Sequence, residues 1–128
     1  MSQLTGTQMK YLHVIYMVQE DEGGIRSVDI ARELGVTKAS VCRMIKLLTR
    51  LELIFVKKSG NITLTPKGKN VGTEIHEKII RIYPFFADYL ELEEPEALSS
   101  TYSFLCGFSD YCIEKLLWKG WAVSQTPV

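Results

Sequence analysis

Residues 27–48, SVDIARELGVTKASVCRMIKLL, predict two short helices joined by a tight turn. Ser27 offers a hydroxyl that can cap the first helix, residues 28–34, and Gly35 tolerates the left-handed conformation that ends a helix. Thr37 is a second capping hydroxyl, and it opens the second helix. The apolar residues of the pair are Ile30, Ala31, Leu34, Val36, Val41 and Ile45. This pattern is typical of a helix-turn-helix, the second helix of which enters the major groove of DNA.

The second helix has two chemically different sides, because successive residues advance by about 100° around a helix. Its inner side is apolar, whereas its outer side carries short side chains at the start and cationic side chains further along. Short side chains let the backbone approach base edges, Arg43 can bind guanine through two hydrogen bonds, and Lys46 and Arg50 suit phosphates. The alternative interpretation is a solvated basic face on an ordinary core helix.

A β-hairpin is expected directly after this helix. Residues 53–57 and 62–64 are rich in strand formers, and residues 58–61 have the composition of a turn. Lys57 and Lys58 lie at the tip, so the hairpin resembles a wing that follows the phosphate backbone. A hairpin that merely closes the core would explain the strands but not the basic tip. The candidate contacts to double-stranded DNA are Ser27, Thr37, Lys38, Ala39, Ser40, Arg43, Lys46, Arg50, Lys57, Lys58, Asn61 and Lys67.

The net charge of zero conceals an uneven distribution along the chain. Residues 1–70 contain 11 Lys or Arg and 6 Asp or Glu, a balance of +5, whereas residues 71–128 contain 4 and 9, a balance of −5. We therefore expect only the first part of the chain to meet a polyanion.

The composition indicates a folded cytoplasmic protein. Of the 128 residues, 46% are hydrophobic, which is enough for a core and argues against disorder. The three cysteines, Cys42, Cys106 and Cys112, show no CxxC pairing and fit reduced thiols. No apolar run reaches the roughly 18 residues of a membrane span, and the N-terminal residues MSQLTGTQMK do not resemble a signal peptide. We therefore expect no membrane association.

Helical patterns occupy most of the remaining chain. Periodic apolar residues predict a helix at 5–21, ended by a glycine pair. Thr65-Pro66 is a strong start for a long helix, which Pro84 should end or kink. A turn or two rich in aromatic residues follows, then helices at 95–105 and 109–119, and a loosely held tail.

Together these elements predict a mainly α fold with a small β-hairpin. An N-terminal winged helix-turn-helix domain, residues 1–65, is expected to precede an all-helical dimerisation domain, residues 66–128. The second half is more apolar and aromatic than a cap over the wing requires, and such a surplus suggests a subunit interface. A symmetric homodimer would recognise a palindromic operator.

With these residues in view, the chain resembles the metal-dependent repressors of the diphtheria toxin repressor and manganese regulator family, in their short two-domain form. The resemblance rests on YLHVIYMV (11–18), the helix-turn-helix motif, LTPKGK (64–69) and FSDYCIEKL (108–116). It implies a homodimer built from the C-terminal helices, with a sensor site for a Mn(II)- or Fe(II)-type ion between the two domains. It also implies repression at palindromic operators.

The same resemblance indicates that most of the family's metal ligands are replaced. The corresponding positions are Lys10 and His13 for the carboxylate pair of the first helix, Ile79 for the histidine of the long helix, and Tyr102, Leu105 and Cys106 for the Glu-x-x-Glu-His cluster. The surviving candidate ligands, His13, His76 and Cys106, form a softer set that could favour zinc, ferrous iron or copper. The alternative is a vestigial site of packed side chains, in which Lys10 replaces the metal by a fixed charge.

The sequence therefore predicts a sequence-specific transcriptional regulator that acts as a repressor and homodimer. One alternative is a regulator that responds to a small apolar ligand, or to no effector. Its pocket would be lined by Tyr83, Phe85, Phe86, Tyr89, Tyr102 and Phe104. Another is a winged-helix module that binds protein, against which the basic outer face argues. An enzyme is not expected, because no Ser-His-acid set, no spaced acid pair and no phosphate-binding glycine loop is present.

Overall fold

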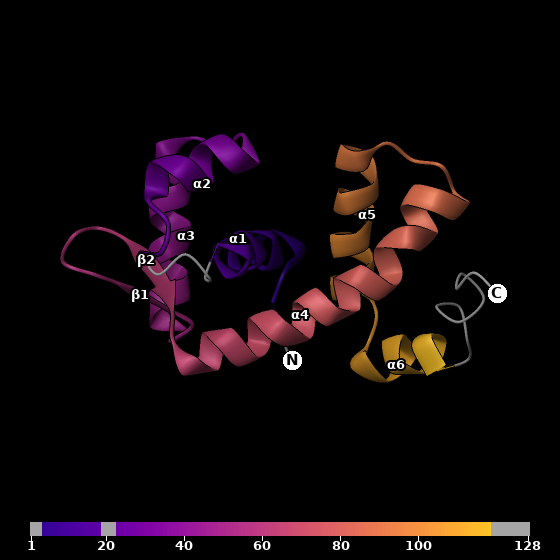
Figure 1. Cartoon of the computed structure of the whole chain (residues 1–128). Coiled ribbons are helices and arrows are strands. Elements are labelled where there is room, and N and C mark those ends of the chain that lie inside the picture. The colour runs from indigo at the N-terminus through magenta and orange to yellow at the C-terminus, as the bar shows by residue number, and fades with distance from the viewer. Residues whose placement is uncertain (1–3, 19–22, 119–128) are drawn as a thin grey trace. The chain divides into compact units, whose positions relative to one another are not determined.

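The structure, a computed structural model, describes residues 4–18 and 23–118 and confirms a mainly α fold with one small hairpin (Figure 1). The elements are α1 (Gly6–Met17), α2 (Ser27–Leu34), α3 (Lys38–Arg50), β1 (Ile54–Val56), β2 (Ile62–Leu64), α4 (Pro66–Pro84), the π-helical turn η1 (Phe85–Tyr89), α5 (Glu94–Gly107) and α6 (Asp110–Trp118). A winged helix-turn-helix precedes a set of helices, as the sequence predicts. No helix among the described residues is long and apolar enough to cross a membrane.

The chain forms two compact units. The N-terminal unit comprises Gln8–Ile75, and the C-terminal unit comprises His76–Val128 together with Met1–Thr7. Helix α4 contributes residues to both units.

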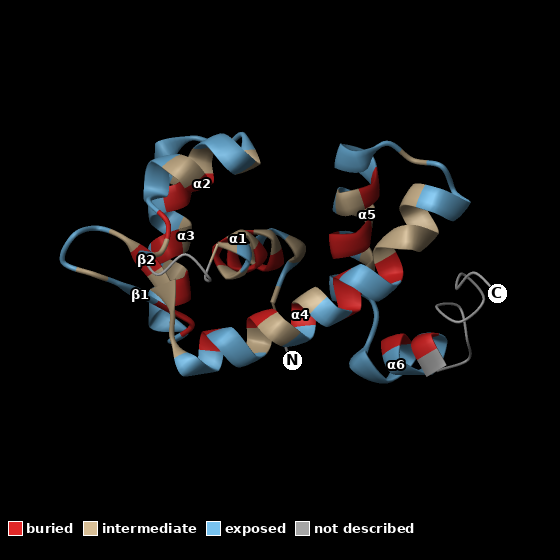
Figure 2. Ribbon diagram, in the orientation of Figure 1, coloured by how far each residue is buried: buried red, intermediate tan, exposed pale blue. Residues whose placement is uncertain are grey.

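The core of the N-terminal unit is built by α1, α2 and α3, which each bury one apolar side (Figure 2). Leu12 of α1, Ile30 of α2 and Leu48 of α3 are all fully buried. Burial of each such side chain contributes about 1.5–3 kcal/mol. This core fixes the orientation of α3, because Leu48 and the equally buried Val41 lie on its inner side.

The hairpin is short but well anchored. Strands β1 and β2 pair antiparallel, with Phe55 opposite Thr63. A third segment joins them, because Ile25 and Ile62 exchange two backbone hydrogen bonds, of 3.0 and 2.7 Å. Gly24 makes this approach possible, since it has a φ of 82° and a Cβ there would lie 2.5 Å from the carbonyl oxygen of Ile62. The bridge ties the segment before α2 to the first residue of β2, which pairs with Val56 next to the turn of the wing.

The first turns of α4 pack closely in the same unit. Thr65 caps the helix, since its hydroxyl accepts the N–H of Gly68 at 3.0 Å and donates to the carbonyl of Glu52 at 2.6 Å. A Cβ on Gly68 would overlap the carbonyl oxygen of Leu53 and lie 2.8 Å from its carbonyl carbon. These contacts hold the beginning of α4 against the chain that enters the wing.

The predicted helix boundaries are correct in part. The left-handed conformation of Gly35, which has a φ of 66°, and the Thr37 cap of α3 are confirmed. The cap assigned to Ser27 is wrong, because Ser27 is already helical and Arg26 occupies the N-cap position without a side-chain hydrogen bond. Helix α1 ends at Met17 instead of continuing to residue 21, and residues 19–22 lie outside the described part.

The boundaries of the later elements differ by smaller amounts. Strand β1 is shorter than the predicted 53–57, and α5 is longer than 95–105. Helix α6 begins one residue after the predicted 109, and its predicted end at 119 and the tail lie outside the described residues.

The C-terminal unit contains the second half of α4, η1, α5 and α6. Proline 84 has no N–H to donate, and the hydrogen bonding changes directly after it, because the N–H of Leu90 donates to the carbonyl of Phe85 at 3.0 Å. The apolar core of this unit is Ile79, Ile82, Ala97, Tyr102, Leu105, Ile113 and Leu117. Lys78 is buried in it, and its ammonium nitrogen lies 3.8 Å from carboxylate oxygens of both Asp110 and Glu114 on α6.

Candidate nucleic-acid interface

The exposed start of α3 is organised by three polar side chains at a spacing of three residues. The Thr37 hydroxyl accepts the N–H of Ser40 at 3.1 Å and donates to the Ser40 hydroxyl oxygen at 3.0 Å. The guanidinium of Arg43 donates to the same oxygen at 3.4 Å. Because the cap of the helix continues into a row of hydrogen bonds, Arg43 is held along the outer face of α3.

The outer face of α3 is solvent-accessible along its whole length. Its exposed members are Thr37, Lys38, Ala39, Arg43, Lys46 and Arg50, while Ser40 is half-buried. The opposite face carries the buried Val41, Ile45 and Leu48. The structure therefore brings the predicted α3 residues together on one basic face, and periodicity alone was sufficient to identify it.

Tyr11 of α1 lies close enough to Arg43 for the positive charge of Arg43 to affect the ionisation of the Tyr11 phenol. This proximity was not predicted from the sequence. Burial raises the pKa of Tyr11, and the positive charge of Arg43 partly offsets that rise. The two residues belong to helices far apart in the sequence. The only available signal was a tyrosine among the apolar residues of α1.

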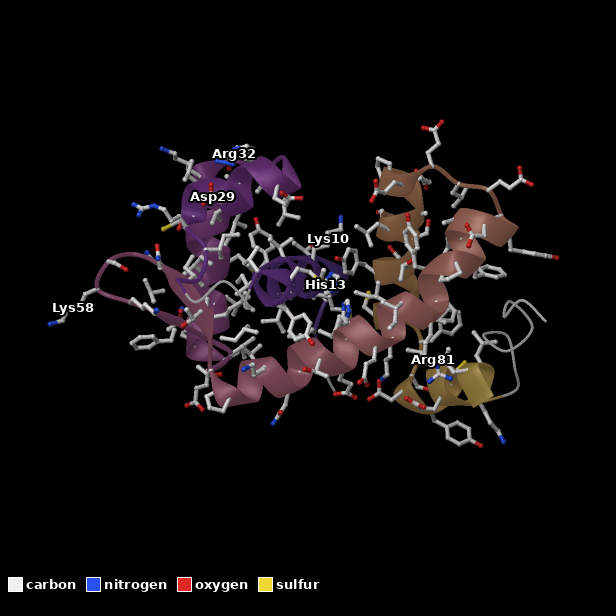
Figure 3. All side chains as sticks on the ribbon, in the orientation of Figure 1. Lys10, His13, Asp29, Arg32, Lys58 and Arg81 are labelled. Carbon is white, nitrogen blue, oxygen red and sulfur yellow. The ribbon has the colours of Figure 1, made fainter. Side chains whose placement is uncertain are left out.

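The wing presents one exposed lysine at its tip. Lys58 is exposed and extends away from the hairpin (Figure 3), whereas Lys57 is half-buried. The turn is closed by Gly60, which has a φ of 95° and donates its N–H to the carbonyl of Lys57 at 2.8 Å. A short, closed turn of this kind holds the Lys58 backbone in one place.

Three other predicted residues lie outside this face and the wing tip. Asn61 is half-buried and donates from its side-chain nitrogen to the carbonyl of Gly23 at 2.6 Å, so it holds the wing to the segment before α2. Lys67 donates to the carbonyl of Leu51 at 3.1 Å, just beyond the end of α3. Ser27 is exposed in the first turn of α2.

The resemblance places Ile79, Tyr102, Leu105 and Cys106 at metal-ligand positions of the C-terminal unit. In the C-terminal unit, Ile79, Tyr102 and Leu105 are 5%, 3% and 3% exposed. The two aliphatic side chains have no donor atom, and burial raises the pKa of Tyr102 to about 12, which keeps its phenol neutral at neutral pH. Manganese is a hard ion that needs several oxygen ligands. These buried residues therefore do not fit it.

The three surviving candidate ligands are distributed over both units. His13 belongs to the N-terminal unit, where it is 9% exposed and stacks on Tyr16 at a centroid distance of 6.4 Å. His76 is half-buried and Cys106 is exposed, and both belong to the C-terminal unit. Within either unit, the described residues contain no group of three or more His, Cys, Asp or Glu side chains that could hold a metal ion.

Comparison with known proteins agrees with this architecture. Residues 3–62 match the family described as iron dependent repressor, N-terminal DNA binding domain. The HTH-type transcriptional regulator MntR of Bacillus pumilus (strain SAFR-032) is 36% identical over 84 residues, which are 61% of this chain and 58% of that relative. The chain therefore spans little more than half of that relative.

Solved structures share the fold over a longer part of the chain. The manganese regulator SloR matches 85% of this chain and 51% of its own at 25% identity, with a TM-score of 0.69. The hypothetical protein SSo2273 from Sulfolobus solfataricus matches 88% of this chain and 86% of its own at 20% identity, with a TM-score of 0.64, and shows the fold alone.

The fold and the basic face of α3 define a protein of the winged helix-turn-helix class. Over residues 3–62 the chain is similar to the family described as iron dependent repressor, N-terminal DNA binding domain, and its N-terminal part is similar to the MntR transcriptional regulators.

Proposed function

We propose that this chain is a sequence-specific transcriptional repressor that binds double-stranded DNA as a homodimer at a palindromic operator. The observation that carries the proposal is the exposed basic face of α3, on which Thr37, Ser40 and Arg43 are linked by hydrogen bonds. A helix held in this way can approach base edges with Arg43 already extended along its surface. The protein then acts in the cytoplasm, where the DNA of a bacterial-type cell lies, and needs no catalytic site.

Within the interface, we assign base contacts to α3 and phosphate contacts to the wing. Arg43 is the base-reading residue, because a guanidinium can donate two hydrogen bonds to guanine. Lys46 and Arg50 lie further along the same exposed face, and Lys58 lies at the exposed wing tip. Their charges suit phosphates, which position a protein on DNA without reading its sequence.

The test compares variants on an operator selected from a random DNA pool and on random DNA. Arg43→Ala should weaken operator binding by about 1–3 kcal/mol and relax the preference at one base pair. Lys58→Ala should weaken binding to all DNA sequences alike. It should also reduce, by about 1, the slope of the logarithm of the binding constant against the logarithm of the salt concentration. Arg81→Ala is the matched control, since Arg81 is exposed in the C-terminal unit. If Arg43→Ala binds both DNAs as the parent does, the assignment is wrong.

We assign the homodimer interface to the apolar surface of the C-terminal unit. A pocket of about 270 Å³ is lined by Ile82, Phe85, Phe86, Phe104 and Leu116. Large apolar side chains lie exposed in the same unit, among them Tyr89, Phe108, Tyr111 and Leu116 at 63%, 51%, 73% and 41%. A monomer rarely exposes so much apolar surface, whereas the centre of a homodimer interface is enriched in it.

Sedimentation of the full chain tests this assignment. We expect a species of twice the 14.6 kDa chain mass at tens of micromolar, and a monomer for Leu116→Asp. Leu116 is partly exposed, so the substitution should leave the fold intact. Val28→Asp is the matched control, because Val28 is an exposed apolar residue of α2. A parent chain that is monomeric would favour the alternative that the pocket admits a small apolar ligand.

A further inference from the structure

The family's metal-ligand positions carry a further inference, which rests on the DNA-binding function proposed above. We propose that manganese does not control DNA binding by this chain, because packed hydrocarbon, a buried phenol and one soft thiol stand where the resemblance places the metal ligands of the C-terminal unit. The arrangement of the C-terminal helices is then maintained by the protein's own side chains.

The first argument comes from the C-terminal unit. Ile79 and Leu105 are buried with 5% and 3% exposure, so both side chains are part of the core of this unit. A metal site at these positions would have to open that core, and neither side chain would supply a ligand. Hydrocarbon that is already packed in this way stabilises the folded unit without any ion.

Four positions are replaced in the C-terminal unit; Cys106 offers an exposed, soft thiol, which suits manganese poorly, and Tyr102 offers a phenol. This phenol would bind a hard cation as the phenolate. The Tyr102 side chain is 3% exposed within the core of this unit, and burial raises its pKa to about 12. Tyr102 therefore behaves as a core side chain and not as a ligand.

Helix α1 carries two further replacements. Lys10 and His13 stand where the family has a carboxylate pair. A lysine ammonium repels a divalent cation. His13 is buried, and its ring is stacked on Tyr16. The two α1 positions thus replace two negative charges by one positive charge and one packed ring.

A fourth observation shows a cation that the chain supplies itself. Lys78 precedes Ile79 on α4, is 5% exposed, and lies 3.8 Å from both Asp110 and Glu114. This ammonium joins α4 to α6 within the C-terminal unit. Formation of this ion pair requires no metal ion.

The experiment uses the full chain, freed of metal by a chelator. Mn(II) is titrated into it by calorimetry, and thermal unfolding and operator binding are measured with Mn(II) and with chelator. SloR serves as the positive control. We expect no heat of binding, no shift in Tm and the same operator affinity in both conditions. If the chain has a manganese site, a Mn(II) concentration of one hundred times its Kd would raise Tm by on the order of 10 °C.

The outcomes are distinguishable. Micromolar binding of Mn(II), or a tenfold gain in operator affinity on its addition, would overturn the inference. Failure to bind DNA in every condition would overturn the proposed function, while calorimetry would still decide whether manganese is bound. Binding of Zn(II) but not Mn(II) would support the inference by showing that only soft donors survive.

Discussion

Replacing Gly68 by alanine tests how α4 is joined to the wing. The new Cβ would overlap the carbonyl oxygen of Leu53 and lie 2.8 Å from its carbonyl carbon. Carbon atoms in ordinary contact are about 3.5–4.0 Å apart, so one backbone must retreat by about 1 Å. The atoms involved are backbone, which cannot rotate away as a flexible side chain does.

The expected cost of this retreat has two parts. Overpacking of a dense contact costs about 1–3 kcal/mol. The same carbonyl of Leu53 accepts the N–H of Thr65 at 3.1 Å, and loss of that hydrogen bond adds about 1 kcal/mol. Gly68→Ala should therefore lower the free energy of unfolding by about 3 kcal/mol, a large fraction of the roughly 5–15 kcal/mol of an ordinary domain.

Urea unfolding followed by circular dichroism measures this change. Gly107→Ala is the matched control, since Gly107 is also helical and a Cβ there has no neighbour within 4 Å. That control should be neutral or stabilise the protein by up to about 1 kcal/mol. If Gly68→Ala is as stable as Gly107→Ala, the close approach of α4 to Leu53 does not exist in solution.

Two further predictions concern ionisable groups of the C-terminal unit. Lys78→Met should stay within about 1 kcal/mol of the parent, because the half-exposed Asp110 and Glu114 keep their hydration. Lys78→Glu should cost about 3 kcal/mol or more, since it buries a carboxylate beside two others; equal stability of the two variants would contradict the burial of Lys78. Burial raises the pKa of Tyr102 from 10.0 to about 12, so the unfolded chain loses this proton first and the free energy of unfolding falls as pH rises from about 10 to 12. Tyr102→Phe should reduce that fall by about 1–3 kcal/mol in urea titrations across this range, and parallel curves for parent and variant would refute the assignment.

Signals that act over a few residues were readable from the sequence. Gly35 ends α2 and Thr37 caps α3, because each acts through the backbone within one turn of itself. The basic outer face of α3 follows from the helical period alone. Ser27 was misassigned because Arg26, one residue earlier, already occupies the N-cap position, and hydroxyl residues are favoured both at caps and in first turns.

Contacts between distant residues were not readable in the same way. The approach of Gly68 to Leu53 depends on how α4 crosses the chain, which no local pattern encodes. The proximity of Tyr11 to Arg43 likewise depends on the packing of α1 against the motif. The replacement of the metal ligands was visible in the sequence, but the burial of Ile79 was needed to show that hydrocarbon is packed there.

The paired hydrogen bonds between Ile25 and Ile62 also affect how α3 behaves before it meets DNA. The bridge closes residues 25–62, which contain α2, α3 and β1, into a loop. Closure of this loop reduces the number of conformations open to the segment before α3 meets DNA. A helix that is ordered in advance loses little conformational entropy on binding, and more of its contact energy is left for discrimination between base sequences.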